Sequence, residues 1–252
     1  MIRALWDRGQ PSPTYILQRG NYLQPGRLVG PGVPSVLTSD RIPFASPSSH
    51  STLDDSLELD GKKTGYRLAM ARWLTRTDHP LTARVFVNRI WRHHFGRGIV
   101  ASLDNFGKAG EQPSHPDLLD WLACEFMDSG WDIKNLHRLI MNSATYRQSS
   151  AVLEAAARLD PDNRWLSHMP LRRLEAEALR DTILAVSGQL DRRPFGPADP
   201  VEVRGDGLVE ASGSSRGYRR SIYVLKRRTQ RLTLFDNFDR PRMSPNLSLI
   251  HI

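Results

Sequence analysis

The sequence predicts a mainly α fold, a helical bundle of about five helices with a minor β element built from the terminal segments. Five stretches between residues 64 and 188 place apolar residues at helical spacing, whereas the first 60 residues are rich in Pro, Gly and Ser. Apolar residues make up 39% of the chain and charged residues 25%, as in ordinary globular proteins. No run of about 18 apolar residues occurs, so we expect no membrane span.

Residues 1–60 are predicted to form an extended lead-in and linker. Residues 14–22 alternate well enough for one strand. The prolines and glycines of residues 24–37 favour a turn-rich, extended segment. Ser, Thr and Asp dominate residues 38–60, which indicates an exposed linker.

The first two helices follow one another closely. The first begins near residue 64 and keeps helical spacing to Leu74, and the sequence Asp78-His79-Pro80 ends it. The second starts at the proline or at Thr82. Gly96 closes it, because glycine suits the left-handed position after a helix.

The third helix is predicted to start with Ser114 as its N-cap and Pro116 in its first turn, and Gly130 ends it. The fourth covers residues 132–149. Its apolar face holds Ile133, Leu136, Leu139 and Ile140.

A fifth helix is predicted over residues 171–188 and completes a helical core of residues 61–191. Residues 192–246 are predicted to form a basic loop and strand region, with one strand over residues 219–228. Residues 247–252 are excluded from the fold as a non-native tail.

Cysteine usage excludes several kinds of site. Cys124 is the only cysteine, so the chain has no internal disulfide and no thiolate metal cluster. Its apolar neighbours predict a buried, inert thiol. The C-x-x-C-H pattern that attaches c-type haem does not occur, so we expect no cofactor in this chain.

Polar residues within apolar helical patterns suggest one candidate cleft. It would gather residues of the second helix, the glycine-rich loop of residues 96–116 and the later helices: Asn88, Arg89, His93, Asp104, His115, Tyr146, Arg147 and Arg180. We expect no metal there, because the adjacent His93 and His94 point about 100° apart on a helix. The loop itself is expected to be a tightly packed connector, and His115 to pair with a carboxylate.

Arginine and acidic residues also alternate around the fifth helix. A buried guanidinium needs paired carboxylates or carbonyls. We therefore expect a partly buried structural network among Arg172, Arg173, Glu175, Glu177, Arg180 and Asp181.

The formal charge of +8 raises the question of nucleic-acid binding. The densest basic stretch offers only Tyr218 and Tyr223 for stacking on bases, and a solvated strand or an acidic protein partner explains it as well. That stretch consists of Arg216, Arg219, Arg220, Lys226, Arg227, Arg228 and Arg231.

Three sequence blocks, PLTARVFVNRIWRHHFGRGIV (80–100), residues 113–150 and RRLEAEALRDTILAVSGQLD (172–191), resemble the DUF1553 or PSD1 domain, which is common in planctomycetes. The segment TYILQRGNYLQPGRLVGPGVPSVL resembles the lead-in to that domain. No catalytic residues are established for the family, so none is carried over to this chain.

The resemblance implies a long, exported cell-surface parent protein with DUF1549 and cytochrome-c-like domains upstream, so that haem c would belong to a domain outside this chain. Met1 would then be an internal codon, and the missing secretory signal would lie upstream. An extracytoplasmic location follows from this interpretation, in the periplasm or at the cell surface.

The sequence leaves three functions open. The leading one is a scaffold without catalytic activity that binds an acidic protein or a polysaccharide. The first alternative is a hydrolase acting on an anionic or carbohydrate substrate through a His–Asp or carboxylate pair. The second is nucleic-acid binding through the basic surface, which rests on charge alone.

Overall fold

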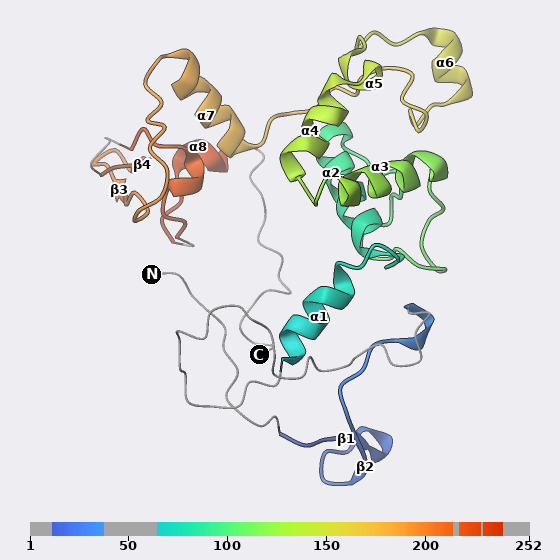
Figure 1. The fold of residues 1–252 in the computed structure, drawn as a ribbon. Helices are drawn as coiled ribbons and strands as arrows, with labels where there is room; N and C mark the ends of the chain where they lie inside the picture. The colour runs from blue at the N-terminus through green and yellow to red at the C-terminus, as the bar shows by residue number, and fades with distance from the viewer. Residues whose placement is uncertain (1–11, 38–64, 214–216, 228, 239–252) are drawn as a thin grey trace. The chain divides into compact units, whose positions relative to one another are not determined.

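The computed structural model describes residues 12–37, 65–213, 217–227 and 229–238 (Figure 1). These residues contain eight α-helices and two two-stranded sheets, which confirms the mainly α fold class with a minor β element. The chain divides into two compact units, one ending at Pro170 and the other beginning at Leu171. The sequence of the expected linker and of the expected tail lies outside the described residues.

The N-terminal segment forms a small antiparallel hairpin. Strand β1 (Thr14–Leu17) pairs with β2 (Pro25–Val29). The predicted strand is confirmed only in its first half, because Arg19 and Gly20 have φ angles of 50° and 74° and turn the chain. A 3₁₀ turn, η2 (Ser35–Leu37), follows.

The first unit is built around three packed helices. Helices α2, α3 and α4 pack against one another (Figure 1). The rings of Phe86 on α2 and Phe126 on α3 stack with centroids 5.1 Å apart. The core includes Val87, Trp91, Phe95, Leu122, Leu136 and Ile140. The helices of this unit are α1 (Tyr66–Leu74), α2 (Thr82–Phe95), α3 (Pro116–Asp128), α4 (Ile133–Asn142), α5 (Ala144–Arg147) and α6 (Glu154–Leu159).

Local sequence signals set most of these boundaries. Gly96 ends α2 with a φ of 85°, and Pro116 is the first residue of α3, both as predicted. Gly130 follows α3 with a φ of 73°. The expected cap at Ser114 is wrong, because its hydroxyl contacts the Ile99 carbonyl and the His115 ring instead of an α3 amide.

The predicted fourth helix is two helices. Asp132 caps α4 by accepting from two backbone N–H groups, and the chain becomes extended at Ser143 with a ψ of 150°. The Ser143 hydroxyl donates to the Ile140 carbonyl at 2.6 Å and accepts from the Tyr146 N–H at 3.1 Å. These side-chain bonds compete with the helical ladder and restart the chain as α5.

The second unit contains α7 (Ala176–Val186) and the C-terminal elements. Its core consists of Ala176, Val201, Val224, Leu232 and Phe235. Helix α7 starts later than predicted, because Glu175 is extended. The remaining elements are β3 (Val201–Val203), β4 (Val209–Ala211), η3 (Ser221–Tyr223) and α8 (Thr233–Asp236).

The strand predicted over residues 219–228 is wrong for residues 219–227, the part that the structure describes. These residues form η3, flanked by two isolated bridges, Asp191 with Arg219 and Asp199 with Val224. Among the described residues of this unit, the strands are β3 and β4, which pair with each other in antiparallel register. Side-chain contacts with α7, described below, take the place of a continuous ladder.

Cys124 is exposed, so the expectation of a buried thiol is wrong. The buried face of α3 consists of Leu119, Leu122, Ala123 and Phe126. Cys124 lies beyond this face despite its apolar neighbours, since each residue turns the helix by about 100°. Among the described residues, no helix has the length and apolar character needed to cross a bilayer.

Candidate functional site

Asn88 is the most deeply buried of the predicted cleft residues, with 1% of its surface exposed. Its Nδ2 donates to the Val100 carbonyl, and its Oδ1 accepts from the Val100 N–H, each at 2.9 Å. The carboxamide therefore pairs with one residue of the loop as a neighbouring strand would. Both the Nδ2 donor and the Oδ1 acceptor are therefore used in bonds that stabilise the fold.

The glycine-rich loop packs closely around this contact. A Cβ atom at Gly98 would lie 2.5 Å from the Val100 carbonyl oxygen and within 2.9 Å of both polar atoms of the Asn88 carboxamide. At Gly110 it would lie 1.9 Å from the Asn105 carbonyl oxygen. The loop is a tightly packed connector, as the sequence predicted.

An ion pair joins α2 to α3. Arg84 Nε donates to Asp120 Oδ1 at 2.6 Å, and Arg84 Nη1 donates to the Pro80 carbonyl at 2.7 Å. The hydrogen bond raises the pKa of Arg84 and lowers the pKa of Asp120. This pair holds the start of α2 against α3.

Histidine and tyrosine rings meet at the other end of α2. His94 Nε2 lies 2.8 Å from His137 Nδ1, and the His94 and Tyr146 rings meet edge to face at 5.3 Å. Tyr146, a predicted cleft residue, thus contacts His94, whereas His93 is exposed. The ring of His115 lies 2.9 Å from the Ser114 hydroxyl.

Of the other predicted cleft residues, three lie at the surface and one belongs to the second unit. Arg89, Asp104 and Arg147 are exposed. Arg180 belongs to the second unit. A single cleft that gathers all eight residues stays a prediction.

In the second unit, Arg180 and Asp181 connect α7 to the C-terminal segment. Arg180 donates to the carbonyls of Gly217 and Arg219 and to the Ser221 hydroxyl. Asp181 accepts from the N–H and the hydroxyl of Ser221 at 2.8 and 2.7 Å. Burial lowers the pKa of Arg180, an effect that nearby acidic groups oppose.

Further ion pairs complete this network. Lys226 pairs with Glu177 at 2.9 Å. Arg219, only 6% exposed, pairs with Asp199 at 3.3 Å and lies over the Tyr223 ring at 4.4 Å. The expected structural network around α7 therefore includes Glu177, Arg180 and Asp181, and it draws Arg219 of the basic stretch into the interior.

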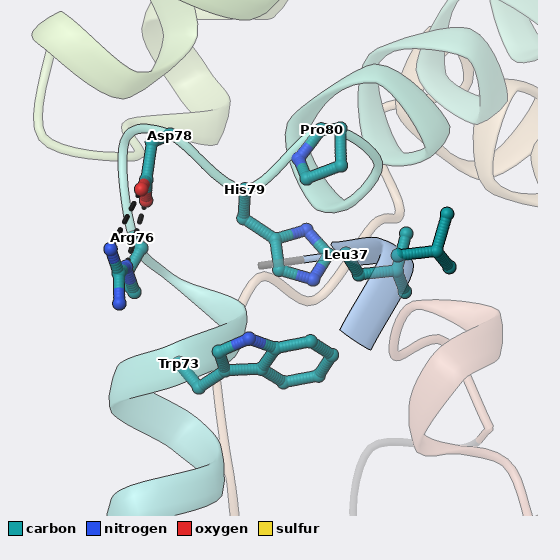
Figure 2. A pocket seen from close by; sticks show the side chains of 7 residues that line it. Leu37, Trp73, Arg76, Asp78, His79 and Pro80 are labelled. Atoms are coloured by element: carbon teal, nitrogen blue, oxygen red, sulfur yellow. Dashed lines mark hydrogen bonds and ion pairs between the residues drawn. The ribbon is translucent and has the colours of Figure 1, made fainter. Parts of the chain in front are cut away.

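A pocket of about 350 Å³ lies at the turn between α1 and α2. We call it the α1–α2 pocket and define it by its lining residues Val36, Leu37, Trp73, Arg76, Asp78, His79 and Pro80. Figure 2 shows the His79 ring between Trp73 and Leu37, with the Arg76–Asp78 pair to one side. Arg76 donates to both Asp78 oxygens, at 2.8 and 2.7 Å.

His79 is 7% exposed, and its two ring nitrogens have different surroundings. Nδ1 accepts from the backbone N–H groups of Leu81 and Thr82 at 3.3 and 3.2 Å, and it lies 2.9 Å from the Thr82 hydroxyl. An acceptor Nδ1 assigns the proton of the neutral ring to Nε2. That buried Nε2 has no hydrogen-bond partner among the described residues.

The family model described as "PSD1: Protein of unknown function (DUF1553)" matches residues 66–247. The chain belongs to the PSD1 family. No curated protein and no solved structure matches it.

The α1–α2 pocket of this PSD1 chain has the features of a binding site: an aromatic wall, an ion pair and a buried donor. Burial lowers the pKa of His79, which keeps the ring neutral and its Nε2–H available to an acceptor. Among the described residues, no group of three or more His, Cys, Asp or Glu side chains is arranged to hold a metal ion. The aromatic wall and the buried Nε2–H donor suit the pocket to binding by apolar contact and hydrogen bonding.

The sequence pattern does not indicate His79 or Trp73 of the PSD1 chain as site residues. It predicts His79 only as part of the signal that ends α1, and it gives Trp73 no role beyond helical spacing. One signal in the sequence could have identified His79. It stands just before a helix whose first residues offer no Ser, Asp or Asn cap, so a histidine nitrogen was available for that role.

Proposed function

We propose that this chain is a scaffold domain without catalytic activity in an exported, haem-linked cell-surface protein, and that it binds a protein or polymer partner. One observation carries this proposal. Polar side chains of both units, among them Asn88, Arg84 and Arg180, bind the chain's own backbone and side chains. Groups used in this way stabilise the fold and are not free to act on a substrate.

The exported and haem-linked part of the proposal is supported by the resemblance of residues 80–100, 113–150 and 172–191 to the planctomycete family. DUF1549 and cytochrome-c-like domains of the same parent chain would be its nearest partners, with haem c in the latter. The location would be extracytoplasmic. An acidic protein or a polysaccharide would be its external partner, as the charge of +8 favours.

A turnover assay tests the scaffold role against the hydrolase alternative. The whole chain is incubated with the p-nitrophenyl esters of phosphate and sulfate and with p-nitrophenyl glucoside and galactoside. We expect nitrophenol release no faster than in buffer. Release that rises with protein concentration and disappears in His115→Ala or Asp104→Ala would replace the scaffold with a hydrolase.

A binding assay addresses the nucleic-acid alternative. Fluorescence anisotropy of a labelled DNA duplex is measured with the whole chain while the salt concentration is increased. Binding to phosphates through several arginines would weaken steeply with salt. We expect no saturable binding at physiological salt, because Arg219 and Lys226 of the basic stretch are paired with Asp199 and Glu177.

The genomic DNA around this reading frame tests the exported, haem-linked assignment. We expect the frame to continue upstream through a C-x-x-C-H motif to a secretory signal. Stop codons on both sides of the frame, with neither feature, would contradict this assignment and leave the scaffold role to be judged by the assays above.

A further inference from the structure

We propose that the α1–α2 pocket binds one neutral sugar ring, and that the Nε2–H of His79 donates a hydrogen bond to an oxygen of this ring. The inference deepens the proposed function and rests on it, because it names a neutral carbohydrate as the polymer that the domain contacts. Hydrogen bonding, charge and shape each support this ligand class.

The first argument is the buried donor. Nδ1 of His79 is engaged by two backbone N–H groups at the start of α2, which directs the ring and leaves Nε2–H as the free end. The ring extends from the turn toward Leu37 and the Trp73 indole, into the pocket (Figure 2). Buried polar groups are nearly always hydrogen-bonded, so this unpartnered donor indicates a ligand that supplies an acceptor.

The second argument is charge. The Arg76 guanidinium and the Asp78 carboxylate neutralise each other, and the pKa of His79 is lowered by burial, so the lining has no net charge. An anion would meet the Asp78 carboxylate, and a cation would meet Arg76 and the Nε2–H donor. A neutral ligand avoids both repulsions.

The third argument is shape and surface. Trp73, Pro80, Leu37 and Val36 give the pocket an apolar wall that can contact the C–H face of a ring. The volume of about 350 Å³ equals the space of about twelve liquid waters, which suits a single ring better than an extended peptide. Sugar hydroxyls both donate and accept, so they can use Asp78 oxygens as well as Nε2–H.

Saturation-transfer NMR on the whole chain tests the proposal with methyl glucoside, methyl galactoside and methyl mannoside as separate probes. We expect at least one probe to receive saturation from the protein. In a separate nitrogen spectrum of the protein, the same probe should shift the His79 Nε2 resonance. His79→Asn keeps an oxygen for the two backbone N–H groups but removes the inward donor. Leu37→Trp fills the pocket and leaves His79 unchanged.

We expect each of these two variants to weaken probe binding about tenfold or more. Leu28→Trp is the matched control, since it adds the same side chain at an exposed position of the β1–β2 hairpin, and it should bind as wild type does. A lack of saturation transfer from wild type for all three glycosides overturns the proposal. Equal binding by wild type and Leu37→Trp also overturns it, as does displacement of a bound glycoside by inorganic phosphate.

The two proposals fail separately. If no methyl glycoside binds and the nitrophenol assay shows no turnover, the carbohydrate ligand is rejected and the scaffold role stands. Turnover of a nitrophenyl glycoside, with sugar binding confirmed, keeps the pocket and replaces the scaffold with an enzyme.

Discussion

At the residue scale, the Asn88 side chain bonds both the N–H and the carbonyl of Val100, as the backbone of a neighbouring strand would. Both hydrogen bonds of the carboxamide are buried and go to backbone groups that have no water to replace them. Leaving a buried backbone group unpaired costs about 1–3 kcal/mol. The stability of the glycine-rich loop therefore depends on this one side chain.

We predict that Asn88→Ala lowers the free energy of unfolding by about 2–4 kcal/mol, because both backbone groups of Val100 lose their partners. Urea denaturation followed by circular dichroism measures the change. Asn142→Ala, at the exposed end of α4, is the matched control and should change the value by less than about 0.5 kcal/mol. Equal denaturation midpoints for the two variants would contradict the role given to Asn88.

His79 has a second consequence at this scale, in the pH dependence of stability. Burial lowers its pKa in the folded chain below the ordinary value of 6.5, so the unfolded chain binds its proton more readily. The stabilisation from neutral His79 is complete above that ordinary value. It is lost progressively as the pH falls below it, toward the lowered pKa of the folded state.

We predict that the free energy of unfolding of wild type falls more steeply than that of His79→Asn between about pH 7 and about pH 5. The asparagine keeps an acceptor at this position but does not titrate. Urea titrations at several pH values measure both slopes. Parallel curves for the two proteins would show that His79 is not held neutral by the fold.

At the element scale, the Arg84–Asp120 pair fixes α2 against α3. The free energy that this ion pair contributes depends on how far its two side chains are exposed to water. The two side chains are 36% and 56% exposed, so water screens their attraction. The stacked rings of Phe86 and Phe126 join the same two helices without such screening. Apolar packing is therefore the main attraction between these helices, and the ion pair adds orientation.

A double-mutant cycle of Arg84→Ala and Asp120→Ala should give a coupling energy of about 0.5–1 kcal/mol. Arg84→Ala alone should cost more than Asp120→Ala alone, since it also removes the bond to the Pro80 carbonyl. Thermal denaturation of the four proteins provides the values. A coupling energy several times larger would mean that the pair is less hydrated than its exposure indicates.

At the scale of the whole molecule, each unit has a core of its own. The cluster around Val87 and Phe126 lies before Pro170, and the cluster around Ala176 and Phe235 lies after it. Helix α7 contributes Ala176 to the second cluster, and Ser221 and Lys226 bind Asp181 and Glu177 on its polar face.

Two fragments of the chain test this division. We predict that residues 1–170 and residues 1–191 show the same amide-exchange protection in α2, α3 and α4. The α7 amides, protected in the whole chain, should exchange in the 1–191 fragment about as fast as in an unfolded chain. Protection of α7 in this fragment equal to that in the whole chain would rule out its dependence on the C-terminal segment.

The sequence was most informative where structure depends on neighbours in the chain. Gly96 and Pro116 marked helix ends through backbone geometry alone. Residues 219–228 alternate in sequence like a strand, but the described part, residues 219–227, makes only two isolated bridges, and bonds to Asp181 and Asp199 fix its path. Asp181 is 40 residues from Ser221 and Asp199 is 20 residues from Arg219, and local pattern does not reveal such distant partners.

The site was harder to predict than the fold for the same reason. The partner of Asn88 is a loop backbone group, and the role of His79 as a buried donor depends on which of its ring nitrogens accepts from the start of α2. Neither of these hydrogen-bond partners can be predicted from residue type. Cys124 was misplaced because a difference of one position on α3 separates the buried face from the exposed one.

The exposed position of Cys124 has a practical consequence. It is the only thiol in the chain, and it lies on α3 away from the packed face. A maleimide surface would therefore capture every molecule through the same atom, Sγ of Cys124, and in the same orientation. A sensor chip prepared in this way would present a uniform layer of protein to a dissolved glycan, with the core of α2, α3 and α4 undisturbed.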